Sequence, residues 1–199
     1  MDIDLSLVWA VVILFGILMY ITMDGFDLGI GILYPFFPDE EHRDVMMNTV
    51  APVWDGNETW LVLGGAGLLA AFPLAYAVIL QALMLPLIFM LLALIFRGVA
   101  FEYRFKAHDT GRHWWDKAFI GGSVAATFFQ GATLGAYIQG LEVVDGTYTG
   151  GPLVWLTPFP IFTGLGLLAA YALLGCSWLI LKTQGALQYR MIQLAHPLV

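Results

Sequence analysis

Four long stretches of this chain contain no charged side chain, over residues 5–23, 74–96, 118–141 and 158–181. A helix rises ~1.5 Å per residue, so about 20 residues cross the ~30 Å hydrocarbon core of a bilayer. Each stretch is therefore long enough to cross a membrane. Apolar residues make up 60% of the chain and charged residues 12%, against roughly 45–50% and 25% in soluble domains. The sequence predicts an all-α integral membrane protein.

A fifth segment, residues 51–72, reads APVWDGNETWLVLGGAGLLAAF. Its apolar half, residues 61–72, is too short to cross alone, so Asp55 and Glu58 would lie within or at the edge of the hydrocarbon. Ionisable groups at that depth are costly and indicate function. The alternative is that the two acids only favour the positive end of a helix dipole, which contributes about 0.3–1 kcal/mol.

We expect a single transmembrane domain over residues 1–199, a polytopic bundle of about five helices. The spans are predicted at 5–36, 51–72, 74–104, 118–141 and 158–181. Residues 104–117 are predicted to be a polar loop, and residues 182–199 a tail without a clear element.

Short-range signals predict helix starts and close helix contacts. Pro52 suits the first turn of a helix, with Thr49 or Asn48 as its cap. Glycines four residues apart, at 25 and 29 and again at 131 and 135, allow two helices to approach closely.

Basic residues set the expected orientation. With five spans, all eight Lys and Arg residues fall in or beside the first inter-helix loop, the third loop and the tail. Loops rich in Lys and Arg face the cytoplasm. The N-terminus is therefore predicted to lie outside.

Acidic residues gather near the predicted cytoplasmic ends of the first three spans. Asp24 and Asp27 are three residues apart and share a helical face. They need a cationic partner, and Arg97 is the basic residue nearest the end of a neighbouring span; otherwise Arg97 only extends toward the interface. Together with Asp55 and Glu58, these acids are candidates for a proton route from the cytoplasm.

Other classes of site are disfavoured. The net charge of −7 argues against nucleic acid as a partner. The single cysteine, Cys176, gives no disulfide framework or zinc pattern. All four histidines lie outside the apolar spans, so we predict no metal site, no catalytic residue and no haem ligated by this chain alone.

Three motifs carry a resemblance to a known family: DGFDLGIGIL at 24–33, APVWDGNETWLVLGGAGLLAAFP at 51–73 and FRGVAFEYR at 96–104. They are long, in order, and resemble subunit II of the cytochrome bd-type quinol oxidases. The resemblance implies a multi-pass protein of the bacterial cytoplasmic (inner) membrane, in a complex that oxidises quinol and reduces oxygen to water.

The same resemblance implies the partners. Haems b and d would be held mainly by subunit I, which also oxidises quinol, so this chain would be a non-haem-ligating subunit that is active only with subunit I. Subunit II is linked with proton and oxygen access. Membrane lipid and small single-span accessory subunits are further expected partners.

Residue roles follow from the matched motifs. Asp55 would belong to a cytoplasmic proton path, with Glu58 an extra acid on the same face. Asp27 and Arg97 are associated with haem integrity or activity. Glu102, Trp54 and Trp60 are expected, like Arg97, to have a structural or haem-supporting role.

Family chains are longer, so we expect this chain to be truncated relative to them. Two alternatives remain open. One is a proton-coupled transporter or channel subunit, since buried acids in broken helices also mark those. The other is a purely structural assembly subunit.

Overall fold

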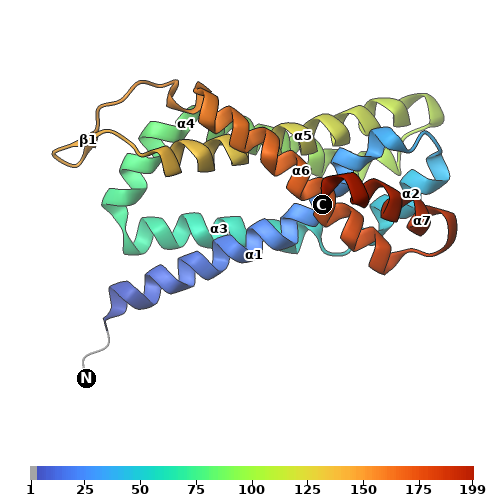
Figure 1. Ribbon diagram of the computed structural model, residues 1–199, viewed down its shortest axis with the longest axis horizontal. Coiled ribbons are helices and arrows are strands. Elements are labelled where there is room, and N and C mark those ends of the chain that lie inside the picture. Colours follow the sequence, from blue (N-terminus) through green and yellow to red (C-terminus); the bar gives the residue numbers. More distant parts are fainter. Residues whose placement is uncertain (1–3) are drawn as a thin grey trace.

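The computed structural model describes residues 4–199, and the chain is almost entirely helical (Figure 1). The α-helices are α1 Leu5–Leu33, α2 Glu40–Val50, α3 Trp54–Ala71, α4 Pro73–Arg104, α5 Asp109–Gln139, α6 Pro158–Lys182 and α7 Gly185–Ala195. Single 3₁₀ turns follow or precede them at η1 Tyr34–Phe36, η2 Val154–Leu156 and η3 His196–Leu198. The strands β1 Val143–Val144 and β2 Thr147–Tyr148 form a small antiparallel hairpin. The predicted all-α class is confirmed.

Within residues 4–199, three helical stretches are long and apolar enough to cross a membrane: Leu5–Phe36, Pro73–Arg104 and Pro158–Lys182. Helices α3 and α5 occupy the positions of the other two predicted spans. Both are less apolar, because α3 begins with WDGNET and α5 begins with a polar turn. The count of five spans stays a prediction.

The predicted start of the second span is wrong. Residues 40–50 already form α2, whose N-cap Asp39 accepts a hydrogen bond from the backbone nitrogen of Glu41 at 3.2 Å. Thr49 therefore lies in the last turn of α2, where its hydroxyl donates to the carbonyl of Met46 at 2.8 Å. Pro52 lies in the turn between α2 and α3, and α3 begins at Trp54 without a side-chain cap.

The predicted polar loop and tail are also wrong. Only residues 105–108 separate α4 from α5, because both helices continue beyond their apolar stretches. The tail contains α7, whose Leu187 and Met191 are buried against the bundle. Helix α1 lies within the predicted first span, 5–36, and continues past Asp24 and Asp27 to Leu33, so these acids lie inside a helix.

Glycines bring α6 into close contact with α1 and α5, as predicted. A Cβ atom on Gly29 of α1 would lie 2.8 Å from the backbone nitrogen of Gly175 on α6. A Cβ atom on Gly131 of α5 would lie 2.7 Å from the Cα atom of Gly164 on α6. Helix α4 is bent where Leu83 leaves helical geometry, one turn before Pro86, as a proline inside a helix requires.

Different elements lie at the two ends of the bundle (Figure 1). The first turn of α1, the α3–α4 junction and the hairpin lie at one end. Helices α2 and α7 and the α4–α5 turn lie at the other. All basic side chains belong to elements of this second end or to the adjoining turns of α4, α5 and α6. The orientation stays a prediction that this arrangement fits.

Candidate functional site

Arg97 on α4 lies at the centre of a cluster of acidic side chains. Its side chain is fully buried. Nη1 donates to Glu58 Oε1 on α3 at 2.7 Å and lies 3.7 Å from Asp24 Oδ1 on α1. Nη2 lies 3.9 Å from Asp27 Oδ2, also on α1. The structure therefore confirms that Arg97 pairs with Asp24 and Asp27, and adds Glu58 from a third helix.

Asn57 holds Asp27 in this cluster. Its Nδ2 donates to Asp27 Oδ2 at 2.7 Å and to the carbonyl of Met23 at 3.2 Å. The side chains of Asp24, Asp27, Asn57, Glu58 and Arg97 are called the acid–arginine cluster below. The hydrogen bond from Asn57 to Asp27 was not predicted from the sequence.

Helix α1 presents both aspartates inward because this part of it is buried on all sides, from Asp24 to Gly31. Gly25 makes this possible, since a Cβ atom there would lie 2.8 Å from the ring of Tyr171 on α6. The cluster thus sits at a point where α1 is enclosed by its neighbours. Two carboxylates and a guanidinium with no exposure must be compensated there by one another or by proton binding.

Asp55 is not part of the cluster. It is exposed on the first turn of α3 and lines, with Glu58, an open groove of about 500 Å³ between α3 and α4. Glu58 has 26% of its side chain exposed, so it faces both the groove and Arg97. The two acids lie three residues apart on one face of α3, and Glu58 connects the exposed acid to the buried ones.

Of the three residues with an expected supporting role, one is linked to the acid–arginine cluster and two are not. The ring of Trp54 stacks on Phe101 at 5.0 Å between centroids, and Phe101 lies beneath the Arg97 guanidinium at 5.2 Å. Trp54 is thereby linked to the cluster. Trp60 instead meets Phe15 on the outer half of α1, and Glu102 is exposed and pairs with Lys106 at 3.1 Å. The structure brings neither of these two residues to Arg97.

A second ionic network was missed by sequence reasoning. The guanidinium of Arg104 is fully buried, donates from Nε to Asp116 Oδ1 at 2.5 Å, and binds Asp44 through Nη1. Arg43 donates to the other Asp116 oxygen at 2.8 Å. This network ties α2 to α4 and α5. The seven-residue spacing of Arg97 and Arg104, two turns of one helix face, was the available signal.

Comparison with known proteins identifies the family. The family model for cytochrome bd terminal oxidase subunit II matches residues 5–199. The chain belongs to this family. It is 37% identical over 194 residues to a probable cytochrome oxidase subunit 2 of Haemophilus influenzae, covering 94% of this chain and 51% of that protein.

Two further relatives of this subunit II family agree. The cytochrome bd-I ubiquinol oxidase subunit 2 of Escherichia coli K12 is 34% identical over 187 residues, with 89% of this chain and 49% of that protein covered. The cytochrome bd ubiquinol oxidase subunit 2 of Bacillus subtilis is 30% identical over 194 residues, with 96% and 57% covered. The chain thus spans about half the length of the relatives it matches. As a subunit II family member, it is an integral protein of the bacterial cytoplasmic membrane.

The family name implies a haem, so we asked where the side chains that could bind haem iron lie in residues 4–199. Haem iron takes axial His, Met, Cys or Tyr ligands. The histidines lie at His42 in α2, at His108 and His113 around the start of α5, and at His196 in η3, all away from the middle of the long helices. Within residues 4–199, no three His, Cys, Asp or Glu side chains gather so as to hold a metal ion. The histidines of residues 4–199 thus lie outside the apolar stretches of the long helices.

Proposed function

We propose that this chain is part of subunit II of a bd-type respiratory oxidase that oxidises quinol and reduces oxygen to water. In this proposal subunit I holds the haems, and the complex is active only when both subunits are present. The family match and the similarity to subunit 2 of two cytochrome bd ubiquinol oxidases support the assignment.

Within that complex, we assign the acid–arginine cluster to proton supply from the cytoplasmic side. One observation carries the proposal: three carboxylates from two helices lie within 4 Å of a single buried guanidinium. One positive charge cannot compensate three negative charges when two of the carboxylates are fully buried. Taking up a proton is the change that removes the excess charge without moving the backbone. The cluster is therefore suited to bind and release protons.

In this proposal, different acids take up the proton from water and hold it inside the bundle. Asp55 is exposed beside the groove, where it can take a proton from water. Glu58 faces both the groove and Arg97, so it can pass that proton inward. Asp24 and Asp27 are the buried acceptors. Oxygen reduction consumes protons, and hydrocarbon does not conduct them. A row of carboxylates that pass protons from one to the next would supply the protons that the reaction consumes.

The test is Asp55→Asn in the assembled oxidase with the full-length subunit. The amide keeps the shape and most hydrogen bonds of the carboxylate but carries no exchangeable acid proton. We expect normal haem content and oxygen consumption per haem d reduced by about 10-fold or more, the low end of a proton-transfer contribution. Because Glu58 can partly substitute, Asp55→Asn with Glu58→Gln should be slower than either change alone.

Glu102→Gln is the matched control. Glu102 is an exposed acid of α4 that pairs with Lys106 outside the cluster, so its amide variant should retain the wild-type rate. Wild-type turnover in the Asp55 and Glu58 double variant, with intact haem, would show that this stretch is not the proton entry and that the acids only complement the helix dipole.

A further inference from the structure

Asn57 on α3 bridges two acceptors on α1 that lie one helical turn apart. Its Nδ2 donates to the carbonyl of Met23 at 3.2 Å and to Asp27 Oδ2 at 2.7 Å. Both hydrogens of the amide nitrogen are used, so turning the amide to present its oxygen would lose both bonds. Asn57 is only 4% exposed, and bulk water therefore competes little for these bonds. Asp27 thus faces a fixed hydrogen-bond donor.

A fixed N–H donor distinguishes the two protonation states of the carboxyl group that it meets. An ionised carboxylate only accepts hydrogen bonds, whereas a carboxylic acid also has an O–H group that needs an acceptor of its own. Hydrogen bonds to a charged partner are about twice as strong as those between neutral groups. Arg97 Nη2 lies 3.9 Å from the same Asp27 oxygen that Asn57 binds. Both contacts favour Asp27 as a carboxylate.

Asp24, three residues earlier on α1, has a different neighbour. The hydroxyl of Tyr20 lies beside the carboxyl group of Asp24. A tyrosine hydroxyl can donate to a carboxylate or accept from a carboxylic acid, so this contact is compatible with both protonation states. Arg97 Nη1 is 3.7 Å from Asp24 Oδ1, which is beyond hydrogen-bonding distance.

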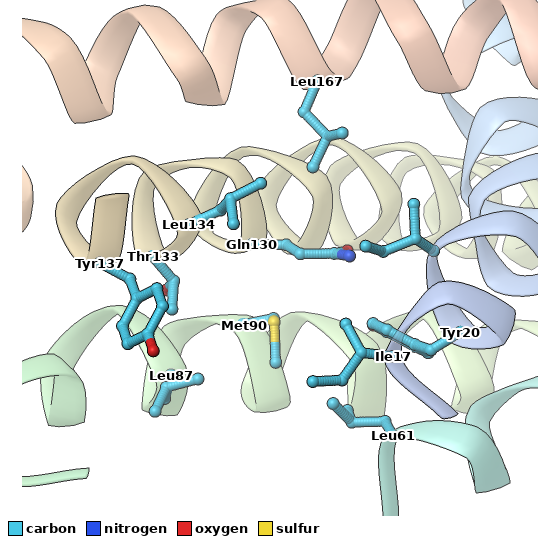
Figure 2. Close-up of a pocket in the computed structure, with 11 residues that line it drawn as sticks. Ile17, Tyr20, Leu61, Leu87, Met90, Gln130, Thr133, Leu134, Tyr137 and Leu167 are labelled. Carbon is cyan, nitrogen blue, oxygen red and sulfur yellow. The ribbon is translucent and has the colours of Figure 1, made fainter. Parts of the chain in front are cut away.

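The side of Tyr20 that faces into the bundle offers a negative charge no compensation. Figure 2 shows Tyr20 in the wall of a cavity of about 280 Å³. This wall is almost wholly apolar, with side chains such as Ile17, Met90 and Leu167. An apolar wall gives a carboxylate neither hydrogen bonds nor a counter-ion. A charge on Asp24 is therefore compensated less well than a charge on Asp27, and binding a proton removes it.

The guanidinium of Arg97 divides the three acids in the same way. Its Nη2 lies near Asp27. Its Nη1 donates to Glu58 at 2.7 Å and lies 3.7 Å from Asp24. Nη1 is thus shared by the partly exposed acid and a buried one. A negative charge that moves between Glu58 and Asp24 stays beside the same nitrogen, so its Coulomb energy changes little.

We propose that Asn57 is a positioning residue that holds Asp27 as the permanently ionised partner of Arg97. Glu58 and Asp24 are then the acids of the cluster that carry the proton. The inference rests on the proton route proposed above and narrows it, since Asp24 accepts the proton and Asp27 does not. In the transfer step the O–H bond of the Glu58 carboxylic acid breaks and an O–H bond forms on Asp24. Glu58 becomes a carboxylate, and the Asp24 carboxylate becomes an acid.

Protonation of Asp27 would block this step. The charged groups that face Asp27 are Asp24 on α1, Glu58 on α3 and Arg97 on α4. Helix α6 meets this part of α1 with the phenol of Tyr171 beside Gly25, and α5 meets it with the hydroxyl of Ser123 beside Gly31. Once Asp27 is neutral, Arg97 has only Glu58 and Asp24 to compensate and holds both as carboxylates. Neither then takes up a proton readily, so transfer slows.

The test is the pH dependence of oxygen consumption per haem d in the assembled oxidase, with the full-length subunit carrying Asn57→Leu. Leucine is similar in size and lacks both N–H donors, so Asp27 competes for the proton as the pH falls. We expect normal haem content and turnover reduced by about 10-fold or more at acidic pH, with recovery toward the wild-type rate as the pH rises. The midpoint of this loss should lie about one to two pH units above any acidic loss in the wild type, as the strength of a hydrogen bond to a charged group implies.

Two further variants accompany it. Asn48→Leu is the same substitution at an exposed position of α2, and it should leave the rate and the pH profile unchanged. Asn57→Asp keeps the shape of the side chain and tests the inference if Asn57→Leu does not assemble. Its carboxylate replaces the donor beside Asp27, and two adjacent carboxylates share a proton. The loss of turnover at acidic pH should therefore recur in Asn57→Asp.

The pH profile separates this role from simple packing. An equal loss at every pH would show that Asn57 only supports the fold, and wild-type turnover at acidic pH would show that it does not govern Asp27. Either result overturns the inference, while a slow Asp55→Asn leaves the entry route standing. Loss of an entry carrier has the opposite signature, because protons are scarcest at high pH, so Asp55→Asn should be slowest there. Wild-type turnover in the Asp55 and Glu58 double variant would refute the route itself, and this inference with it.

Discussion

Replacing Arg97 by Gln is the sharpest test of how the cluster holds the bundle together. The guanidinium has no exposure and contacts acids from α1 and α3. Removing it leaves three carboxylates, of which Asp27 keeps the hydrogen bond from Asn57. Removing one partner of a buried ion pair costs about 3–5 kcal/mol, whereas ordinary substitutions cost about 0.5–3 kcal/mol. We therefore expect a loss of at least ~3 kcal/mol in the free energy of unfolding.

A second substitution separates charge from packing. Glu58 makes the shortest contact with Arg97, at 2.7 Å, and is partly exposed. Glu58→Gln removes one of the three negative charges that Arg97→Gln leaves uncompensated. The double variant should therefore be less destabilised than the sum of the two single variants, with a coupling of about 0.5–3 kcal/mol.

The assay is the folded fraction that remains after heating the detergent-purified complex, for wild type, both single variants and the double variant. Arg190→Gln serves as control, because Arg190 is exposed and, within residues 4–199, donates to the carbonyl of Phe36 and lies over the ring of Phe37, with no acidic partner. Equal losses for Arg97→Gln and Arg190→Gln, or additive losses for Arg97→Gln and Glu58→Gln, would refute the view that the cluster is held by compensation of buried charge.

Two further predictions concern packing and orientation. Gly29→Ala should destabilise the complex by about 1–3 kcal/mol, because the added methyl group meets the α6 backbone, which cannot move aside. Gly65→Ala on α3, with open space around it, should be neutral or stabilising by up to ~1 kcal/mol. Thermal unfolding of the two variants under matched conditions compares their stabilities. Lys106→Cys, in the α4–α5 turn, should be shielded from an impermeant thiol reagent in intact cells, and Thr147→Cys in the hairpin should be labelled; the reverse pattern would overturn the orientation.

The helices and the pairing of Arg97 with Asp24 and Asp27 were predictable because each rests on a local rule. Uncharged stretches of about 20 residues specify helices in a bilayer. Two acids on one helix face at membrane depth require a nearby cation, and the sequence offers few. The close contacts at Gly29 and Gly131 follow similarly from the spacing of small residues.

The helix boundaries at the basic end and the exposure of Asp55 could not be predicted in the same way. The helices at this end include three segments of polar or mixed composition, residues 40–50, 109–117 and 185–195. Such a composition is equally compatible with a loop and with a helix on the surface. Whether Asp55 or Asn57 faces inward depends on the rotation of α3, which its Gly-rich and uneven composition leaves undetermined. Tertiary contacts with α1 and α4 fix that rotation.

Contacts around the two buried arginines of α4, Arg97 and Arg104, fix the position of the first turn of α3 relative to the acid–arginine cluster. Phe101 lies between them on α4: its ring lies beneath Arg97, stacks on Trp54 and meets the edge of Phe119, which in turn meets Tyr34 beside Arg104. Aromatic pairs of this kind each contribute about 0.5–1.5 kcal/mol beyond area burial.

Arg104 fixes α2 through Asp44, and α2 leads within three residues into the first turn of α3. Trp54 fixes the same turn from the other side. The groove position of Asp55 is therefore determined by both arginines of α4, although within residues 4–199 Asp55 forms no hydrogen bond or ion pair with either of them. A proton route that depends on the spacing between Asp55 and Glu58 then requires α2, α3 and α4 to be held as one unit.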